Sequence, residues 1–366
     1  MMLNVEQCII TLTRNCNLRC SFCYAKRTGY LANETIEFND VKKLIDFCND
    51  AKVKFVVFSG GEPALYPRLA EIIRYVKSRE HKMLATIATN GIMLSDYDFC
   101  KELIESGLDY IDISLKGKNE EECLALVGKE CLSKQLKAIH NVSCFSTEFT
   151  CSMVLTCSNI DGFCEAVEAA QNNGARQFSF TFALDNEESE YKDIDYLKRN
   201  NPYLLIDKFI SQIDKLNIIT KGEWWVEYTF PICVYTEKHL SMLRGKLAAP
   251  CQIYKGNGIT FDTGMNLLPC SMFIDDKIGK FGLDFSTYEE FENYVECTRY
   301  NSTIKQLSAM PSEECNDCEH LKACFGGCPV FWKNCSFESL MEFKKNYSNS
   351  ETKFFSDEAN CLVSKR

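Results

Sequence analysis

The sequence predicts an α/β protein whose amino-terminal half repeats a strand–helix unit. From residue 5 to about 185, short apolar runs rich in Val, Ile, Phe and Thr alternate with amphipathic stretches. This alternation is typical of a parallel sheet covered by helices. We count six units, too few for a closed eightfold barrel. We therefore expect a partial barrel or an open sheet, with ligands at the carboxyl ends of the strands.

The predicted strands are short runs with the composition of buried strands. In order they are Gln7–Leu12, Phe55–Ser59, Met83–Thr89, Tyr110–Leu115, Phe149–Thr156 and Gln177–Leu184. After an acidic stretch, Asp185–Arg199, comes an aromatic strand at Trp224–Phe230. Beyond Cys233 the periodicity weakens and Gly, Pro and Cys become frequent.

The predicted helices fill the gaps between the strands. They are Asp40–Asp50, Arg68–Arg79, Asp96–Ser106, Glu120–His140 and Asp161–Asn173, with a further helix near Pro202–Leu216. Polar pairs fit two helix starts and glycines fit two helix ends, namely Asn39-Asp40, Ser95-Asp96, Gly107 and Gly174.

The composition argues against some classes of function and favours a metal-binding protein. The chain has 366 residues, a net charge of −10, 22 cysteines and four histidines. The negative charge argues against sequence-independent nucleic-acid binding. No apolar run approaches the roughly 18 residues of a membrane span, and the amino terminus lacks the features of a signal peptide, so we expect a cytoplasmic protein. In a reducing cytosol, so many thiols indicate a sulfur-ligated metal more than a disulfide framework.

Three thiols directly follow the first strand in the run Cys16-Asn17-Leu18-Arg19-Cys20-Ser21-Phe22-Cys23. Three thiolates from one tight loop can hold three irons of a [4Fe–4S] cube and leave the fourth iron open to a ligand. A three-cysteine zinc site that awaits a histidine, or a set of surface thiols, is the alternative.

A second motif, Ser59-Gly60-Gly61-Glu62-Pro63, follows the second strand. Two glycines allow a backbone to approach a ligand closely, and a glutamate can accept hydrogen bonds from an ammonium group. By itself a Gly-Gly-Glu-Pro sequence indicates no more than a turn. Because this one follows the three-cysteine loop by one strand–helix unit, the two motifs together are a specific signal of a ligand site.

Together these motifs resemble those of the radical S-adenosylmethionine (SAM) enzymes over roughly residues 5–185. The resemblance implies that Cys16, Cys20 and Cys23 hold a [4Fe–4S] cluster whose unique iron chelates SAM. It also implies that SAM contacts Tyr24, the turn Gly60, Gly61, Glu62 and Pro63, the pair Thr89 and Asn90, and Ser114. Lys116-Gly117 departs from the Asp-Gly that peptide-modifying members often carry.

The carboxyl-terminal part holds four more thiols within fourteen residues, Cys315, Cys318, Cys324 and Cys328. The spacing Cys-x2-Cys-x5-Cys-x3-Cys is hard to explain by four cysteines that only pack in a core. A zinc ribbon is the alternative to an iron–sulfur site. The run Cys324-x3-Cys328-Pro329 has the form found where neighbouring cysteines serve different clusters. Upstream, Cys251 and Gly264 precede Cys270 in a predicted hairpin.

This arrangement resembles the SPASM domain, a carboxyl-terminal extension of radical SAM enzymes that binds two auxiliary [4Fe–4S] clusters. The resemblance implies that Cys251, Cys270 and Cys328 hold the first auxiliary cluster and that Cys315, Cys318 and Cys324 hold the second. Cys361 resembles the usual closing ligand of the second cluster better than Cys335 does. Cys233 is the candidate fourth ligand of the first cluster, a hydrogen-atom donor, or a bystander beside a cluster left open for substrate.

The expected architecture is therefore a partial (β/α)6 TIM-like barrel followed by a small Cys-rich SPASM domain. We expect the barrel over residues 1–190, a bridging helix and strand over 191–245, and the SPASM domain over 246–366. Most other cysteines, such as Cys48, Cys100, Cys151 and Cys164, fit small buried apolar residues.

The resemblance implies that a 5′-deoxyadenosyl radical, made from SAM, abstracts hydrogen from a ribosomally made peptide or protein side chain. The outcome would be a crosslink, thioether, epimerisation or oxidation. A flavodoxin- or ferredoxin-type reductant is expected. Because the first cysteine of the motif is residue 16, we expect a leader peptide to need a separate binding protein or a groove on this chain.

Other functions stay open at this stage. An anaerobic sulfatase-type maturase would carry an Asp base where this chain has Ser271. A radical SAM dehydrogenase or rearrangement enzyme could act on a small molecule. From another class, the chain could be a zinc or iron–sulfur binding or electron-transfer protein with no catalytic role.

Overall fold

The computed structural model describes residues 5–26, 34–185, 190–227, 230–248 and 252–349. Its described strands form one sheet in the order β10-β9-β8-β1-β2-β3-β4-β5-β6-β7. The strands are β1 (Gln7–Thr13), β2 (Phe55–Gly60), β3 (Leu84–Thr89), β4 (Tyr110–Leu115), β5 (Glu148–Leu155), β6 (Phe178–Phe182), β7 (Trp224–Val226), β8 (Gly258–Phe261), β9 (Asn266–Leu268) and β10 (Gly279–Lys280).

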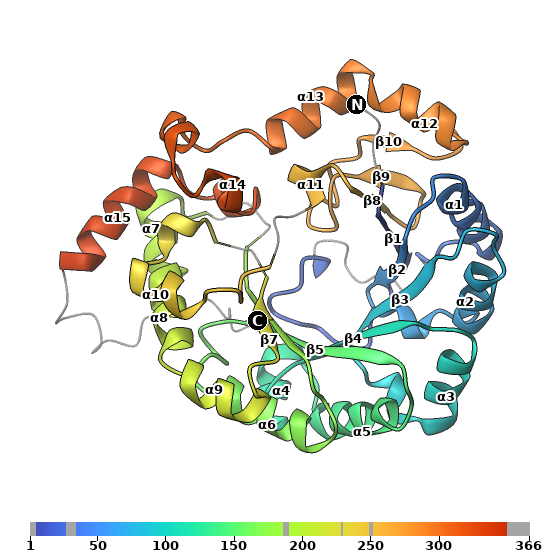
Figure 1. The fold of residues 1–366 in the computed structure, drawn as a ribbon, viewed down its shortest axis with the longest axis horizontal. Helices are drawn as coiled ribbons and strands as arrows, with labels where there is room; N and C mark the ends of the chain where they lie inside the picture. The colour runs from blue at the N-terminus through green and yellow to red at the C-terminus, as the bar shows by residue number, and fades with distance from the viewer. Residues whose placement is uncertain (1–4, 27–33, 186–189, 228–229, 249–251, 350–366) are drawn as a thin grey trace.

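All six predicted barrel strands are present, and each is parallel to the next. Helices α1 to α6 lie outside these strands (Figure 1). The structure thus confirms the partial α/β barrel. Parallel strands place all their carboxyl ends at one edge, so the loops after β1 to β4 meet there.

The described helices include two sets, one around the barrel and one in the carboxyl-terminal part. The first set is α1 (Phe38–Asp50), α2 (Leu69–Lys77), α3 (Tyr97–Glu105), α4 (Glu120–Val127), α5 (Leu132–Ser143), α6 (Phe163–Asn172), α7 (Asp193–Arg199), α8 (Pro202–Ile210) and α9 (Ile213–Thr220). The second is α10 (Glu237–Met242), α11 (Gln252–Lys255), α12 (Tyr288–Val295), α13 (Thr298–Leu307), α14 (Leu321–Cys324) and α15 (Phe337–Asn349). Among the described helices, none is long and apolar enough to cross a bilayer.

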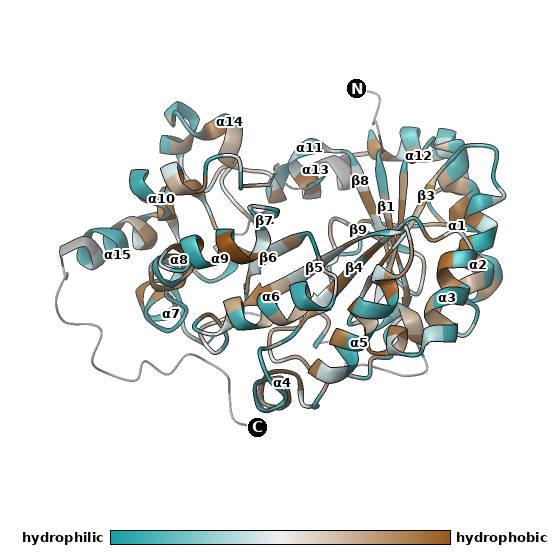
Figure 2. Cartoon of the chain, turned by 60° about the horizontal axis from the view of Figure 1, so that its bottom comes forward, coloured by the Kyte–Doolittle hydropathy of each residue, from teal (hydrophilic) through white to brown (hydrophobic). Residues whose placement is uncertain are grey.

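The barrel helices separate their hydrophobic and hydrophilic faces, as Figure 2 shows. In α1, for example, the buried side chains are Val41, Leu44, Ile45, Phe47 and Cys48. Cys48, Cys100, Cys151 and Cys164 are all buried, which confirms their prediction as core residues. This apolar shell holds the strands in register and leaves their carboxyl ends to the site.

One predicted helix, Glu120–His140, is wrong as a single element. It is two helices, α4 and α5, because Gly128 adopts a left-handed conformation (φ +72°) and ends α4. The Glu120 carboxylate then accepts hydrogen bonds from the backbone N–H groups of Leu132 and Ser133 (2.9 and 2.8 Å) at the start of α5. Local periodicity alone could not show this turn, because both helices keep an apolar face.

Further predicted elements need correction. The helix near Pro202–Leu216 is divided into α8 and α9 at Ser211-Gln212. The strand Trp224–Phe230 is found only over Trp224–Val226, and residues 228–229 lie outside the described part. The acidic stretch Asp185–Arg199 contains α7, whose early aspartates and late Lys198 and Arg199 suit the helix dipole.

The first helix also starts earlier than predicted. It begins at Phe38, and Glu37 precedes it without a side-chain cap, so Asn39-Asp40 is not the cap. At α3 the prediction is confirmed, because Asp96 accepts hydrogen bonds from the N–H groups of Asp98 and Phe99.

The carboxyl-terminal part shares both sheet and core with the barrel. Strand β8 is parallel to β1, with Gln7 opposite Gly258 and Ile10 opposite Phe261. The ring of Phe47 on α1 contacts those of Phe261, Phe281, Phe285 and Phe291, with centroids 5.6–6.1 Å apart. The expected division at 190 and 245 stays a prediction.

Candidate active site

The three-cysteine loop leaves β1 and rests on the end of α4. The backbone N–H groups of Arg19 and Ser21 donate to the carbonyls of Val127 and Leu126, both at 2.9 Å. Cys16, Cys20 and Cys23 are all half-buried. The loop is therefore held in place by the barrel before any ligand binds.

The thiols of this loop influence one another. Burial raises the pKa of Cys16 to about 11, and the charges of Glu62, Cys20 and Cys23 add to that rise. Burial also raises the pKa of Cys20, while the Lys116 ammonium opposes it. Burial makes the Cys16 and Cys20 thiols costly to deprotonate unless a cation binds them, so three cysteines in this loop fit an iron–sulfur cluster with cysteine ligands.

The Gly60-Gly61-Glu62 turn packs on the end of β1. A Cβ on Gly60 would lie 2.3 Å from the Thr13 carbonyl oxygen, and one on Gly61 would lie 2.3 Å from that of Asn15. The N–H groups of Gly61 and Glu62 donate to these two carbonyls, at 2.7 and 2.8 Å. The glycines thus allow the approach of one backbone to another, which locks the turn against the three-cysteine loop.

The Glu62 carboxylate is buried and accepts hydrogen bonds from the chain itself. Its donors are the Ala64 N–H (3.0 Å), the Thr89 hydroxyl (2.5 Å) and the Asn90 N–H (2.7 Å). Burial raises the pKa of Glu62, and these three donors oppose the rise. The Asn90 amide in turn donates to the Asn17 side chain at 2.7 Å. Glu62 and Asn90 therefore connect the ends of β2 and β3 to the three-cysteine loop.

Gln135, on α5, is a site residue that the sequence analysis missed. It is fully buried, and its Nε2 donates to the carbonyls of Asn90 (2.7 Å) and Ser114 (2.8 Å). Its Oε1 accepts from the Lys116 N–H at 3.2 Å. A lone amide on the apolar face of a predicted helix was the signal that could have revealed it.

Lys116 is a buried cation at this edge of the barrel. Its ammonium donates to the Ser114 hydroxyl at 2.6 Å and lies 5.8 Å from the centre of the Phe22 ring. Its charge also opposes the rise that burial causes in the pKa values of Cys20 and Glu62. The departure noted in the motif after β4 thus places positive charge beside the three-cysteine loop.

The barrel interior contains a second missed residue, Asp112 on β4. It lies on the same strand face as Tyr110 and Ser114, and Ser152 on β5 donates a hydrogen bond to its carboxylate. Its Oδ1 is buried and has no hydrogen-bond partner among the described residues. Burial raises the pKa of Asp112 to about 6, with Glu227 adding to the rise. Such a carboxylate is suited to accept a hydrogen bond or a proton from a bound molecule.

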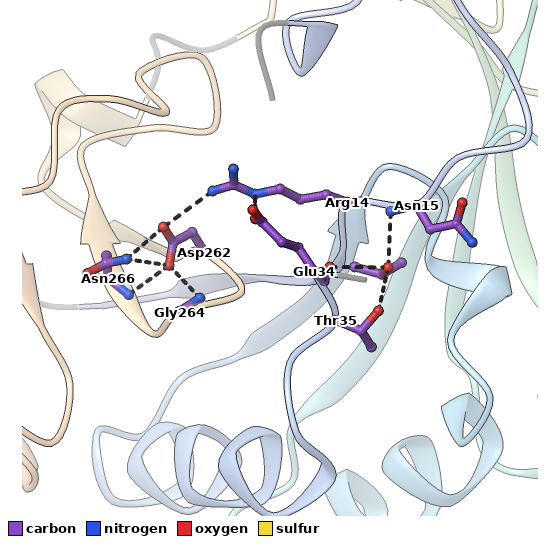
Figure 3. Close-up of polar contacts among 8 residues, drawn as sticks. Arg14, Asn15, Glu34, Thr35, Asp262, Gly264 and Asn266 are labelled. Atoms are coloured by element: carbon purple, nitrogen blue, oxygen red, sulfur yellow. Dashed lines mark hydrogen bonds and ion pairs between the residues drawn. The ribbon is translucent and has the colours of Figure 1, made fainter. Parts of the chain in front are cut away.

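Figure 3 shows how Arg14, just after β1, connects this edge to the β8–β9 turn. Its Nε lies 3.0 Å from Glu34 and its Nη2 lies 3.7 Å from Asp262. Asp262 also accepts hydrogen bonds from the N–H groups of Gly264 and Asn266, both at 2.8 Å. The carboxyl-terminal part is thereby fastened beside the barrel mouth.

A cavity opens at this junction. Its lining includes Arg14, Tyr24, Gly60, Gly61, Asp262 and Ser271. Burial raises the pKa of Tyr24 to about 12, although a hydrogen bond with Ser59 lowers it and the charges of Cys23 and Cys270 raise it further. Tyr24 thus stands between the three-cysteine loop and Cys270.

The other predicted ligands form two groups. Cys270 and Cys328 pack on the same small apolar cluster, made by Ile253, Phe273 and Val330. The third expected member, Cys251, lies outside the described residues. Cys315, Cys318 and Cys324 form the other group; burial raises the pKa of Cys315 and of Cys324, and the charge of Cys318 adds to both rises. Cys361, the expected closing ligand, also lies outside the described residues.

Cys233 lies beside this second group. The charges of Cys324 and Cys315 raise its pKa, after the larger effect of burial. The N–H of the preceding residue, Ile232, donates to Cys324 Sγ at 3.2 Å. The expectation that Cys233 serves the first auxiliary group stays a prediction, because Cys251 of that group lies outside the described residues.

The spacing of the thiols bears on the zinc alternative. A tetrahedral zinc ion with bonds of about 2.3 Å brings its sulfurs to about 3.8 Å from one another. Within the described ranges, the one trio of His, Cys, Asp or Glu whose ligand atoms all lie within 4.8 Å is Glu237, Glu319 and His320 at the surface. No described cysteine trio is therefore as tight as a zinc site requires.

Comparison with known proteins identifies the barrel. The model of the radical SAM superfamily matches residues 10–170. These residues form a radical SAM domain. They contain the three-cysteine loop, the Gly60-Gly61-Glu62 turn and Ser114.

Curated relatives match between about a third and three quarters of this chain. Fe-coproporphyrin III synthase of Methanosarcina barkeri is 35% identical over 130 residues, which cover 36% of this chain and 32% of that protein. The 7,8-dihydro-6-hydroxymethylpterin dimethyltransferase of Methanocaldococcus jannaschii is 26% identical over 281 residues, 73% of this chain and 53% of that protein. The chain spans about a third to a half of the length of these relatives.

Solved structures share the fold over most of the chain. The structure described as native anSMEcpe with bound AdoMet has a TM-score of 0.68 at 16% identity and covers 94% of this chain and 97% of its own. Streptococcus suis SuiB bound to the precursor peptide SuiA has a TM-score of 0.62 at 18% identity and covers 90% of this chain and 72% of its own. The likeness therefore extends beyond the radical SAM domain into the cysteine-rich part.

Proposed function

We propose that this chain is a radical SAM enzyme with two auxiliary iron–sulfur clusters and that it modifies a peptide or protein side chain. When bound, the first cluster and SAM supply a 5′-deoxyadenosyl radical that abstracts a substrate hydrogen. The observation that carries the proposal is that the loops at the carboxyl ends of β1, β2 and β3 are hydrogen-bonded to one another. There, hydrogen bonds through Glu62, Asn90 and Asn17 hold the three-cysteine loop to the ends of β2 and β3.

The residues at this edge of the barrel would have two roles, to hold the first cluster and to bind SAM. Cys16, Cys20 and Cys23 would hold the first cluster, and Glu62 fixes the turn that would receive the SAM amino group. Tyr24, on the cavity wall, would lie beside the adenine. Thr89, Asn90 and Ser114 lie along the same edge and are held by Glu62 and Gln135, so they would form the remaining SAM contacts.

A peptide substrate is supported by the fold shared with SuiB, whose structure contains a precursor peptide. A sulfatase-type maturation is less well supported. Ser271 lines the cavity where a base would be needed, and Asp262 is the one carboxylate among the residues that line it. That carboxylate already pairs with Arg14 and accepts hydrogen bonds from Gly264 and Asn266.

A small-molecule substrate is the second candidate. It is favoured by the curated relatives, whose names describe a porphyrin synthase and a pterin dimethyltransferase. The cysteine-rich part beyond the barrel supports the peptide reading instead, because the likeness to SuiB and anSMEcpe includes it.

The proposal is tested by anaerobic reconstitution followed by SAM cleavage. About twelve irons and twelve sulfides per chain are expected for three cubes, and the reduced protein is expected to release 5′-deoxyadenosine. The triple variant Cys16→Ala, Cys20→Ala, Cys23→Ala should lose about four irons and all cleavage. The matched control is Cys144→Ala, an exposed thiol at the end of α5, which should change neither. Bound zinc without iron, or cleavage that survives in the triple variant, would contradict the proposal.

The substrate class is tested with short peptides encoded beside this gene. A SAM-dependent change in the mass or the chirality of such a peptide is expected, together with faster release of 5′-deoxyadenosine. If only a metabolite fraction of a cell extract accelerates that release, the small-molecule candidate replaces the peptide.

A further inference from the structure

The segment that carries Cys233 packs directly on the turn between Cys324 and Cys328. The Ile232 N–H donates to Cys324 Sγ at 3.2 Å. A Cβ on Gly327 would lie only 2.7 Å from the backbone nitrogen of Pro231, so this close approach requires the glycine. Cys233 itself lies in a short 3-10 turn, Ile232–Val234, that follows at once.

The turn that faces Cys233 has a conformation suited to a cluster ligand. Phe325, Gly326 and Gly327 all have positive φ angles, of 48°, 82° and 76°. This turn directs the Gly326 N–H to the Cys324 sulfur, which thus accepts from two backbone groups, Gly326 and Ile232. Backbone N–H groups that point at a cysteine sulfur are typical of iron–sulfur sites, where they tune the potential.

The Cys233 side chain is half-buried and packs against the main apolar core. Burial raises the pKa of Cys233 to about 12, the charges of Cys324 and Cys315 add to the rise, and Lys344 opposes it. The Lys344 ammonium also donates to the Cys233 carbonyl at 2.6 Å. Two backbone contacts, from Ile232 to Cys324 and from Pro231 to Gly327, therefore hold Cys233 beside the cysteine group.

Cys335 has different surroundings. It is buried, its thiol donates to the Phe331 carbonyl at 3.7 Å, and Asp193 is the charge that raises its pKa. Cys335 belongs to the main apolar core, and Asp193 is the first residue of α7. Cys335 therefore faces the core next to α7 and not the cysteine group.

We propose that Cys233 supplies the fourth thiolate of the iron–sulfur cluster held by Cys315, Cys318 and Cys324. This inference rests on the proposed function, because it requires that this group binds a cluster. It assigns the closing ligand to a residue upstream of the group and leaves Cys335 as a core residue. It also removes Cys233 from the candidates for the group of Cys251, Cys270 and Cys328.

The test uses full-length protein that carries Cys16→Ala, Cys20→Ala and Cys23→Ala, so that only auxiliary clusters contribute to the spectra. In this parent, about eight irons per chain are expected after anaerobic reconstitution. Adding Cys233→Ala should remove between about one and about four irons, because an incompletely ligated cube loses an iron or is lost. The electron paramagnetic resonance signal of one reduced auxiliary cluster should disappear or change to that of a three-iron cluster.

Three further variants test whether the loss of iron is specific to the Cys233 thiol. Adding Cys335→Ala or Cys361→Ala to the same parent should keep the iron and both signals. Cys233→Ser, whose hydroxyl can still bind iron, should restore the iron content with a shifted signal. In the otherwise natural sequence, a far-ultraviolet circular dichroism spectrum of Cys233→Ala that matches that of the natural protein shows that the fold is intact.

The outcomes separate this inference from the proposed function. If the parent holds its auxiliary iron and Cys233→Ala changes neither iron nor spectrum, the assignment of Cys233 is wrong. Loss of a cluster only in Cys361→Ala or Cys335→Ala would overturn it in the same way. If the parent binds no iron at all, the auxiliary clusters themselves, and so the proposed function, are at fault.

Discussion

The two halves of the candidate site are built differently. In the barrel half, the loop and turn that would receive SAM are attached to strands with fully buried side chains such as Ile10, Phe58 and Ile113. In the cysteine-rich half, no side chain between residues 308 and 325 is buried. The difference teaches that apolar packing shapes the first site, whereas the second would depend on its metal for its shape.

The largest expected effect follows from that contrast. Removing iron with a chelator should expose the segment around α14, so that trypsin cleaves after Lys322 at least roughly tenfold faster. Cleavage after Lys101, an exposed residue of the barrel helix α3, should keep its rate. Mass spectrometry of timed digests measures both. Equal acceleration at the two sites would show that the barrel also needs metal to hold its shape.

A smaller effect is expected within the barrel half. Glu62→Gln places an amide where the carboxylate accepts from the Ala64 and Asn90 N–H groups and the Thr89 hydroxyl. Unsatisfied buried groups should lower the free energy of unfolding by about 2–3 kcal/mol, and SAM binding should weaken. Urea unfolding and equilibrium dialysis with SAM measure these changes.

The control for this variant is Glu71→Gln, which removes an exposed carboxylate that pairs with Arg68. It should change neither stability nor SAM binding, because exposed ion pairs contribute little. Should Glu62→Gln bind SAM as the natural protein does, the turn would not depend on this carboxylate.

The smallest expected effect is at Asp112 in the barrel interior. There a substitution should raise the free energy of unfolding, whereas Glu62→Gln should lower it. The fold raises the pKa of Asp112 to about 6, so it favours the protonated acid. Stability from this group is therefore greatest below the usual Asp pKa and falls as the pH rises through about 6. Asp112→Asn should be more stable than the natural protein by roughly 1–2 kcal/mol at about pH 7.5, with a smaller difference at about pH 5.

Anaerobic thermal unfolding at the two pH values measures this difference, and Asp98→Asn, at an exposed position of α3, should show none. The same Asp112→Asn variant should still cleave SAM but lose turnover of substrate, since a destabilising buried group is often kept for function. A gain that is equal at both pH values would mean that Asp112 is ionised throughout.

Much of the barrel could be predicted from sequence because its information is local. The alternation of β-branched runs with amphipathic stretches located all six strands, and the three-cysteine and Gly-Gly-Glu motifs predict a site at their ends. The break at Gly128 escaped prediction, because the apolar pattern continues across the two helices that it separates.

The sequence by itself determined which segments are strands, which cysteines belong to metal-like spacings, and that residues 10–170 carry the radical SAM pattern. Only the tertiary structure decided the contacts between distant residues. It placed Gln135 between Asn90 and Ser114, Lys116 beside Cys20, and Cys233 beside Cys324. The physical reason is that periodicity and spacing act over a few residues, whereas these side chains meet through packing across 21 to 96 positions.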